Sequence, residues 1–176
     1  MEYIDVLDEK GNKTGEVKSK DEVHEKGLWH RAVHIWILNS KNEILLQLRS
    51  KNLVSSPGKW DISAAGHISE GEESLISAER ELFEELGVKI PIESFILLGH
   101  VTQSAIKNNG TYINNEFNDV YLIRSDLKIE DFKFNDGEVE KVEYVPLETF
   151  KQWVQDKRAD IVQRPDEFEL LFSYLK

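Results

Sequence analysis

Hydrophobic and polar residues alternate along this chain in many short segments, and such alternation predicts β-strands. Turn-forming clusters such as Asn39–Asn42 and Ser55–Gly58 separate neighbouring segments. The expected strands are Tyr3–Val6, Gly15–Lys18, Ala32–Leu38, Ile44–Leu48, Trp60–Ala64, Phe95–Thr102, Thr111–Arg124 and Lys141–Val145. The first two would form a hairpin around a turn at Asp8–Asn12.

Three further segments have helical spacing. The longest runs from Glu73 to Leu86 and ends at Gly87, which suits the left-handed position that closes many helices. Leu147–Lys157 carries apolar residues at helical intervals, and Pro165 suits the first turn of a C-terminal helix. Mixed strands and helices predict an α/β or α+β sandwich.

The length of the chain fits one domain, spanning residues 1–176. We divide it into an N-terminal hairpin extension (1–28), a core (29–160) and a C-terminal helix (161–176). No internal repeat, low-complexity tract or linker interrupts this order.

The chain is acidic, with a formal net charge of −11, and it contains no cysteine. Disulfides, thiolate metal sites and a cysteine nucleophile are therefore excluded. An excess of negative charge repels phosphate backbones and anionic lipids, so neither nucleic acid nor a membrane is expected as a partner. If the substrate is phosphorylated, cations must bridge it to the protein, which favours a divalent metal.

The N-terminal residues 1–20 are polar and lack the apolar core of a signal peptide. Apolar stretches such as Ile35–Leu38 are far shorter than the roughly 18 residues of a membrane-spanning helix. We therefore expect a cytoplasmic protein. The sequence leaves the oligomeric state open, a homodimer included.

The segment from Glu73 to Leu86 has one apolar and one acidic face. At about 100° per residue, its apolar residues fall on one side as the expected core face, namely Leu75, Ala78, Leu82 and Leu86. Glu81, Glu84 and Glu85 share a different face. Like charges at this spacing destabilise a solvated helix slightly, whereas Mg²⁺ binds carboxylate oxygens and bridges to phosphates. The alternative is a plain solvated acidic face.

The loop before this segment completes a longer pattern, G-x5-E-x7-R-E-U-x-E-E-x-G-U, where U is aliphatic. Every fixed position is matched, by Gly66, Glu72, Arg80, Glu81, Leu82, Glu84, Glu85, Gly87 and Val88. This is the Nudix box, and the sequence resembles the Nudix hydrolase family. The resemblance implies an α/β/α sandwich with a mixed β-sheet, in which the box forms a loop–helix–loop.

The resemblance also implies roles for the matching residues. Glu84, Glu85 and the Gly66 carbonyl would bind metal, and Glu81 would be a ligand or the base that activates water. Arg80 would hold a catalytic glutamate, and Glu72 would stabilise the loop or join the outer metal shell. The cofactor would be Mg²⁺, with Mn²⁺ as a substitute. Beyond the box, Glu138 and Glu140 are candidates for one more carboxylate.

These roles imply hydrolysis of a diphosphate linkage in a small, nucleoside-diphosphate-type molecule. Two or three metal ions would neutralise the diphosphate, and one would lower the pKa of bound water. A carboxylate would complete the deprotonation, and water would attack one phosphorus in line.

Segments outside the box resemble the isopentenyl-diphosphate-isomerase-like branch of the family. They are residues 24–32, Leu48–Ser50, Pro57–Asp61, the Gly66-His67 pair and residues 115–121. The isomerase carries a cysteine two residues before the histidine of that pair, where this chain has Ala65. Isomerisation is therefore disfavoured. A non-catalytic nucleotide sensor is the other alternative, although such domains usually lose box carboxylates.

The isomerase holds a metal with histidines, and His24, His30 and His67 lie at similar places in this sequence. They would retain a metal or contact phosphate. His34 shares strand parity with His30, so both can lie on one face. Arg31, Arg49 and His30 are candidate substrate contacts. A base could stack on Trp36, Trp60, Phe117 or Tyr121, although most aromatic residues in such a fold belong to the core.

Overall fold

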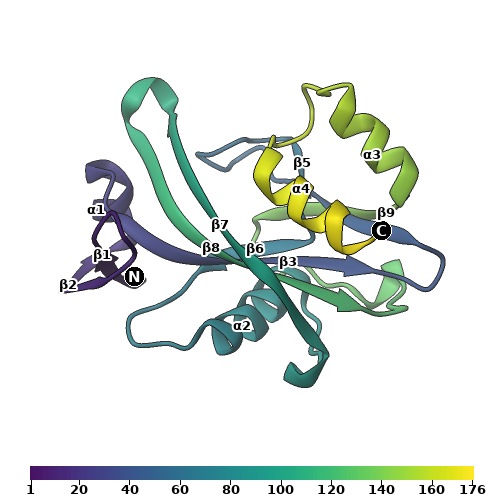
Figure 1. Cartoon of the computed structure of the whole chain (residues 1–176), viewed down its shortest axis with the longest axis horizontal. Helices are drawn as coiled ribbons and strands as arrows, with labels where there is room; N and C mark the ends of the chain where they lie inside the picture. The colour runs from purple at the N-terminus through teal and green to yellow at the C-terminus, as the bar shows by residue number, and fades with distance from the viewer.

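The computed structural model describes all residues, 1–176, as a mixed β-sheet between helices (Figure 1). No helix is long and apolar enough to cross a bilayer. In chain order, the elements are β1 (Tyr3–Leu7), β2 (Lys13–Ser19), α1 (Lys20–Lys26), β3 (Trp29–Leu38), β4 (Glu43–Arg49), β5 (Trp60–Asp61), β6 (Ala64–His67), α2 (Ser74–Leu86), η1 (Ile92–Ser94), β7 (Phe95–Lys107), η2 (Asn108–Gly110), β8 (Tyr112–Arg124), η3 (Ile129–Asp131), β9 (Val139–Pro146), α3 (Leu147–Gln155) and α4 (Pro165–Tyr174).

Strand β3 organises the sheet. It runs parallel to β8 along its whole length and antiparallel to β6. β8 pairs with β7, while β4 pairs with β5 and β9. The sheet therefore mixes parallel and antiparallel pairs, as expected from the sequence.

Two hydrophobic cores cover the two faces of the sheet. Odd-numbered residues of β3, such as Val33 and Ile35, pack with α2 residues Ala78, Leu82 and Leu86. Even-numbered residues, such as Trp36 and Leu38, pack against α3 and α4. Figure 1 shows α2 on one side of the sheet and α4 on the other. This arrangement is the predicted α/β/α sandwich.

The segment expected as one strand, Trp60–Ala64, is two strands. Trp60 and Asp61 pair with β4, whereas Ala64–His67 pairs with β3. Between them, at Ile62 and Ser63, the chain passes from β4 to β3. The alternating pattern in the sequence therefore continues across two strands that pair with different neighbours.

The N-terminal extension contains helix α1 as well as the expected hairpin. Ser19 caps α1 by accepting a hydrogen bond from the Glu22 amide, and Gly27 closes it in the left-handed conformation. With seven residues, α1 is too short to give a clear hydrophobic period. The extension also holds the box loop, because the Glu70 amide donates to the Tyr3 carbonyl and the Gly71 amide donates to Asp5.

Strand β7 continues to Lys107, five residues beyond its expected end at Thr102. β7 pairs only with β8, and β8 pairs with β3 only from Asn115 onward, so residues 105–114 form a two-stranded hairpin that we call the arm. Exposure weakens the apolar pattern there, which hides the strand from sequence analysis. The arm reaches the loop after β4, since Lys107 donates to Ser55 and Ser56.

Candidate functional site

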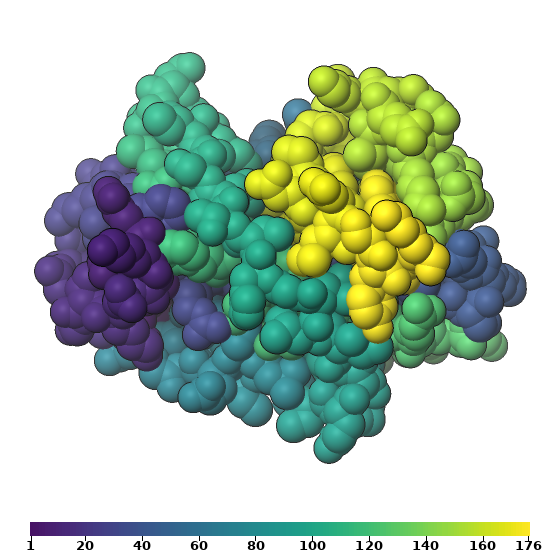
Figure 2. All heavy atoms as spheres, in the orientation of Figure 1, coloured from purple at the N-terminus to yellow at the C-terminus, as the bar shows by residue number.

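A cavity of about 810 Å³ opens between the arm, the loop after β4 and the loop that joins α3 to α4. Figure 2 shows the molecule hollowed between the arm and α3–α4. Two groups of charged side chains line the cavity. Glu81, Glu84, Glu85 and Glu138 form an acidic cluster; Arg49, Lys107 and Arg164 form a basic cluster.

The acidic cluster begins on α2, whose three box carboxylates all line this one cavity. Glu81 and Glu85 are buried, while the Glu84 side chain is about half exposed. Burial raises the pKa of Glu81 to about 7, against the lowering effect of Arg80. Burial and the neighbouring charge of Glu81 raise the pKa of Glu85 well above its usual range. Buried like charges of this kind favour a bound cation.

Arg80 connects the carboxylates to the loop. Its guanidinium donates to Glu81 at 2.7 Å and to Glu84 at 3.1 Å. It also donates to Glu72 at 2.9 Å and to the carbonyl of His67 at 3.0 Å. Glu72 accepts a further bond from Ser77 and does not line the cavity. The geometry therefore assigns Glu72 to holding Arg80 and the loop in place.

Glu85 is held by residues outside the box. The Gln47 side chain donates to its Oε2 at 2.8 Å, and the Ala65 amide donates to the same atom at 3.2 Å. Gln47 is buried on β4 and Ala65 lies on β6, so the carboxylate is fixed from two strands. Sequence analysis missed both partners because each contact depends on the tertiary fold.

Gly66 provides the space in which the Glu81 carboxylate lies. A Cβ at this position would be 2.0 Å from Cδ of Glu81 and 2.2 Å from its Oε2. The φ angle of Gly66 is one that any residue can adopt, because it is not in the left-handed region. A glycine is therefore needed here for its lack of a side chain. Buried carboxylate oxygens beside the backbone of a residue without a side chain are suitable ligands for a hard divalent cation.

Replacing Gly66 by Ala should displace Glu81. We expect a loss of about 1–3 kcal/mol in the free energy of unfolding, typical of overpacking, together with loss of metal-dependent activity. Thermal unfolding and activity assays measure the two effects. The Glu81→Ala change should restore stability in the Gly66→Ala background but not activity. Equal stability losses in both backgrounds would contradict the contact.

The basic cluster depends on Asp61. Arg164 donates to both Asp61 oxygens, at 2.8 and 2.9 Å, and Arg49 lies 3.4 Å from Oδ2. Burial would raise the pKa of Asp61, but the charges of the two arginines lower it to about 2. The Lys107 ammonium has only hydroxyl partners, and burial and Arg164 lower its pKa. The cluster therefore carries more positive than negative charge, which suits an anionic substrate.

A group of histidines lies beside these charges. One ligand atom each of His24, His30 and His67 lies within 4.8 Å of the other two. Burial lowers the pKa of His24 to about 4 and lowers that of His67. His30 contacts the Leu28 carbonyl through Nδ1, and its buried Nε2 has no hydrogen bond.

Glu116 adds a carboxylate to the histidines. Its Oε1 lies 3.4 Å from Nε2 of His30 and 3.7 Å from Nε2 of His67. Unprotonated imidazoles and a carboxylate are suitable ligands for a transition-metal ion. The site would therefore fit a metal, and Glu116 was not among the residues singled out in the sequence.

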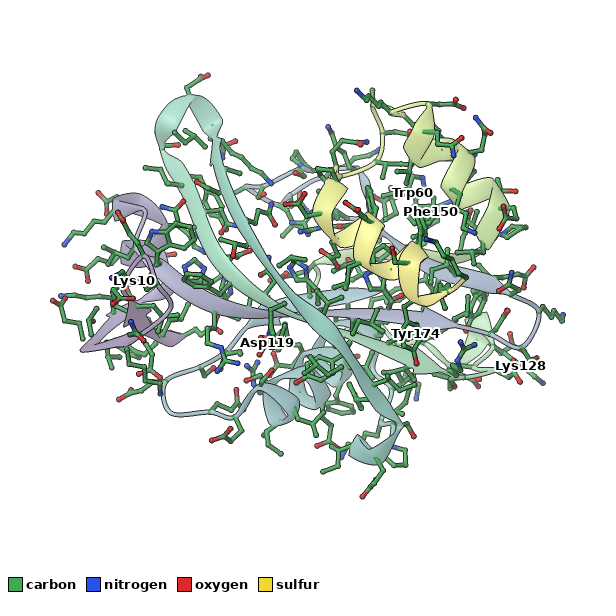
Figure 3. The ribbon with its side chains drawn as sticks, viewed as in Figure 1. Lys10, Trp60, Asp119, Lys128, Phe150 and Tyr174 are labelled. Carbon is green, nitrogen blue, oxygen red and sulfur yellow. The ribbon has the colours of Figure 1, made fainter.

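Several expected substrate contacts lie elsewhere. Arg31 pairs with Asp119, which projects from β8 toward α2 (Figure 3), and Arg31 does not line the cavity. It stands on an odd-numbered position of β3, so its side chain lies on the face away from His30 and His34. His30 is fully buried within the histidine group. Arg49 and Glu138 do line the cavity, whereas Glu140 is exposed and does not.

None of the aromatic residues considered for base stacking lines the cavity. Trp36 is fully buried, and Tyr121 is buried beside α2. Trp60 lies beside Phe150 near the C-terminal helices (Figure 3). Phe117 packs on Trp29. A nucleoside base would therefore need a different platform.

A mixed sheet between helices, with a glycine-led loop and the carboxylates of the following helix at a cavity, is the architecture of Nudix-type proteins. A model of the NUDIX domain matches residues 28–165. The chain belongs to the Nudix hydrolase family, whose members generally use divalent metal ions.

Two relatives show where the chain lies within the family. Nudix hydrolase 3 of Arabidopsis thaliana is 49% identical over 156 residues, which cover 87% of this chain. The match spans only 20% of that relative's length. An isopentenyl-diphosphate Delta-isomerase of Pectobacterium atrosepticum is 33% identical over 96% of this chain and 86% of its own. The chain is thus similar both to a hydrolase and to an isomerase.

Solved structures share the fold. The protein DR0079 from Deinococcus radiodurans superposes with a TM-score of 0.68 at 23% identity, over 98% of each chain. The NUDIX domain of Shewanella oneidensis NrtR, solved with ADP ribose, has a TM-score of 0.61 at 18% identity. It covers 90% of this chain and 100% of that domain. At such identities, these matches support the architecture alone.

Proposed function

We propose that this protein is a Mg²⁺-dependent hydrolase that cleaves the diphosphate linkage of a small, nucleoside-diphosphate-type substrate. The observation that carries the proposal is the convergence of Glu81, Glu84 and Glu85 on one cavity that also contains the basic cluster. Glu84, Glu85 and the Gly66 carbonyl would hold the metal. Bound Mg²⁺ would neutralise the diphosphate and lower the pKa of a water molecule.

The protein's own residues orient this chemistry. Arg80 holds the Glu81 carboxylate beside Gly66, where this carboxylate would bind metal or take the proton of the attacking water. Glu138 adds a further carboxylate at the cavity. Arg49 and Lys107 would bind phosphate oxygens, which offsets the repulsion between an acidic protein and its anionic substrate. We further propose a cytoplasmic location.

A substrate panel tests the proposal. It comprises nucleoside di- and triphosphates, nucleotide sugars, ADP-ribose, dinucleotides and prenyl diphosphates, each with Mg²⁺. At least one compound should release a phosphate or pyrophosphate product, and in ¹⁸O-labelled water the label should enter at phosphorus. Inertness of the folded, Mg²⁺-supplied protein across the whole panel would contradict the proposal.

The similarity to an isomerase makes isomerisation the second candidate. The isomerase uses a thiol at the place of Ala65, and this chain has no cysteine. Isopentenyl diphosphate in the panel separates the two activities, because an isomerase would return an isomer with its diphosphate intact. A nucleotide sensor would bind a panel member without cutting it, yet all the box carboxylates are present here.

A further inference from the structure

His34 lies on β3, at the cavity, in contact with the C-terminal helix. Its Nδ1 is 2.7 Å from Oε2 of Glu167, a residue in the first turn of α4. Trp36 donates its indole N–H to Oε1 of the same carboxylate at 2.9 Å. All three side chains are buried. Glu167 thus joins two residues of the central strand to a helix that follows them by about 130 positions in the sequence.

These contacts define the tautomer of His34. Indole N–H is only a donor, so Glu167 serves as an acceptor there. The second carboxylate oxygen, Oε2, is the atom that contacts Nδ1 of His34, and a carboxylate oxygen accepts. An ionised carboxylate has no proton to give. The proton between the two groups therefore belongs to Nδ1 of His34, and a neutral imidazole then has its lone pair on Nε2.

Nε2 of His34 is available to a ligand. No group of the protein forms a hydrogen bond with this atom, and it is not completely shielded from solvent. The ring lines the cavity, and the β3–β6 register sets His34 directly across from Ala65. Ala65 precedes Gly66, whose backbone adjoins the Glu81 carboxylate. An oriented hydrogen-bond acceptor therefore lines the same cavity as the carboxylates that would bind the metal and diphosphate.

We propose that His34 is a specificity-determining residue that contacts the substrate, and that Glu167 is a positioning residue that fixes its tautomer. Nε2 accepts a hydrogen bond from a hydroxyl or amino group on the organic part of the diphosphate. A ligand without that donor leaves a desolvated acceptor unpaired. The inference rests on the proposed function and narrows its substrate class to diphosphates of polar, donor-bearing groups, as opposed to plain hydrocarbons.

A matched set of probes tests this role. We compare an ω-hydroxyalkyl diphosphate with the alkyl diphosphate of the same chain length and with a methoxy-terminated analogue, which can only accept. The protein should favour the hydroxylated probe in kcat/KM by about tenfold or more. The methoxy and alkyl probes should be alike. A ratio near one between hydroxylated and alkyl probes would overturn the proposal.

Glu167→Gln should reverse the hydrogen-bonding sense of His34. The amide carbonyl can still accept from Trp36, while the amide N–H₂ donates to Nδ1 and moves the ring proton to Nε2. The methoxy probe should then exceed the alkyl probe. ¹⁵N NMR of the imidazole should show Nδ1–H in the unaltered protein and Nε2–H in the variant. Glu169→Gln, at an exposed position of α4, is the matched control and should change neither result.

Binding separates this inference from the proposed function. Non-hydrolysable bisphosphonate analogues of the hydroxylated and alkyl probes are titrated into the protein with Mg²⁺ by calorimetry. Tighter binding of the hydroxylated analogue, with a shifted Nε2 signal, supports the role of His34 even if no diphosphate is hydrolysed. Hydrolysis with equal affinities, or Nε2–H in the unaltered protein, overturns it and leaves the proposed function standing.

Discussion

Replacing Glu84 by Gln should lower kcat/KM for Mg²⁺-dependent diphosphate hydrolysis by about a thousandfold. A bound metal contributes several kcal/mol of charge stabilisation in the transition state, and each 1.36 kcal/mol corresponds to about tenfold in rate. The Glu84 side chain is half exposed, and its only polar contact in the protein is with Arg80 at 3.1 Å. Folding stability should therefore change by less than about 1 kcal/mol.

Glu79→Gln is the matched control for this variant. Glu79 lies on the same helix but does not line the cavity and makes no hydrogen bond or ion pair there. Steady-state kinetics at several Mg²⁺ concentrations should show normal activity for Glu79→Gln. If Glu84→Gln also kept its activity and its Mg²⁺ dependence, Glu84 would not be a metal ligand.

Glu81→Gln should stabilise the metal-free protein at pH 8 and have little effect at pH 5. Because the pKa of Glu81 is raised from 4.5 to about 7, the folded state binds this proton more tightly than the unfolded state. The resulting stability is present below about pH 4.5 and is lost as the pH rises through about 7. The shift corresponds to about 3 kcal/mol, and the neutral amide avoids that loss.

At pH 8, saturating Mg²⁺ should make the unaltered protein more stable than Glu81→Gln. The ionised carboxylates of the unaltered protein gain a cation, whereas the variant has lost one of them. Thermal unfolding at pH 5 and pH 8, with and without Mg²⁺, measures the four differences. Burial lowers the pKa of His24 to about 4, so the stability that unprotonated His24 contributes is present above about pH 6.5 and is lost as the pH falls toward 4. Both proteins contain His24, so this contribution cancels when their stabilities are compared. An unaltered protein that is the more stable at pH 8 without metal would contradict the burial of this charge.

Local sequence rules predict the acidic cluster because a helix fixes its own periodicity. The spacing of Glu81, Glu84 and Glu85 puts them on one face wherever the helix lies, and the predicted core residues Ala78 and Leu82 are fully buried. The helix also ends at Gly87, as expected. The positions of the strands along the chain can be predicted in the same way, since alternation is a local property.

Contacts between distant segments could not be predicted in this way. Arg164 and Asp61 are about a hundred residues apart, and the pairing depends on how α4 crosses the sheet. Glu116 becomes a neighbour of His30 only through the parallel register of β3 and β8. Strand parity alone predicts that Arg31 and His30 lie on opposite faces of β3. No local rule predicts which of these two faces lines the cavity, so Arg31 could not be excluded as a substrate contact from the sequence.

Anomalous diffraction from crystals containing Mn²⁺ and a non-hydrolysable methylene bisphosphonate tests the account most directly. We predict metal peaks about 2.1–2.2 Å from carboxylate oxygens of Glu84 and Glu85 and from the Gly66 carbonyl, bridged to the bisphosphonate. A further peak among His24, His30 and His67 is compatible with the account. Peaks confined to those histidines, with the glutamates free of metal, would contradict it.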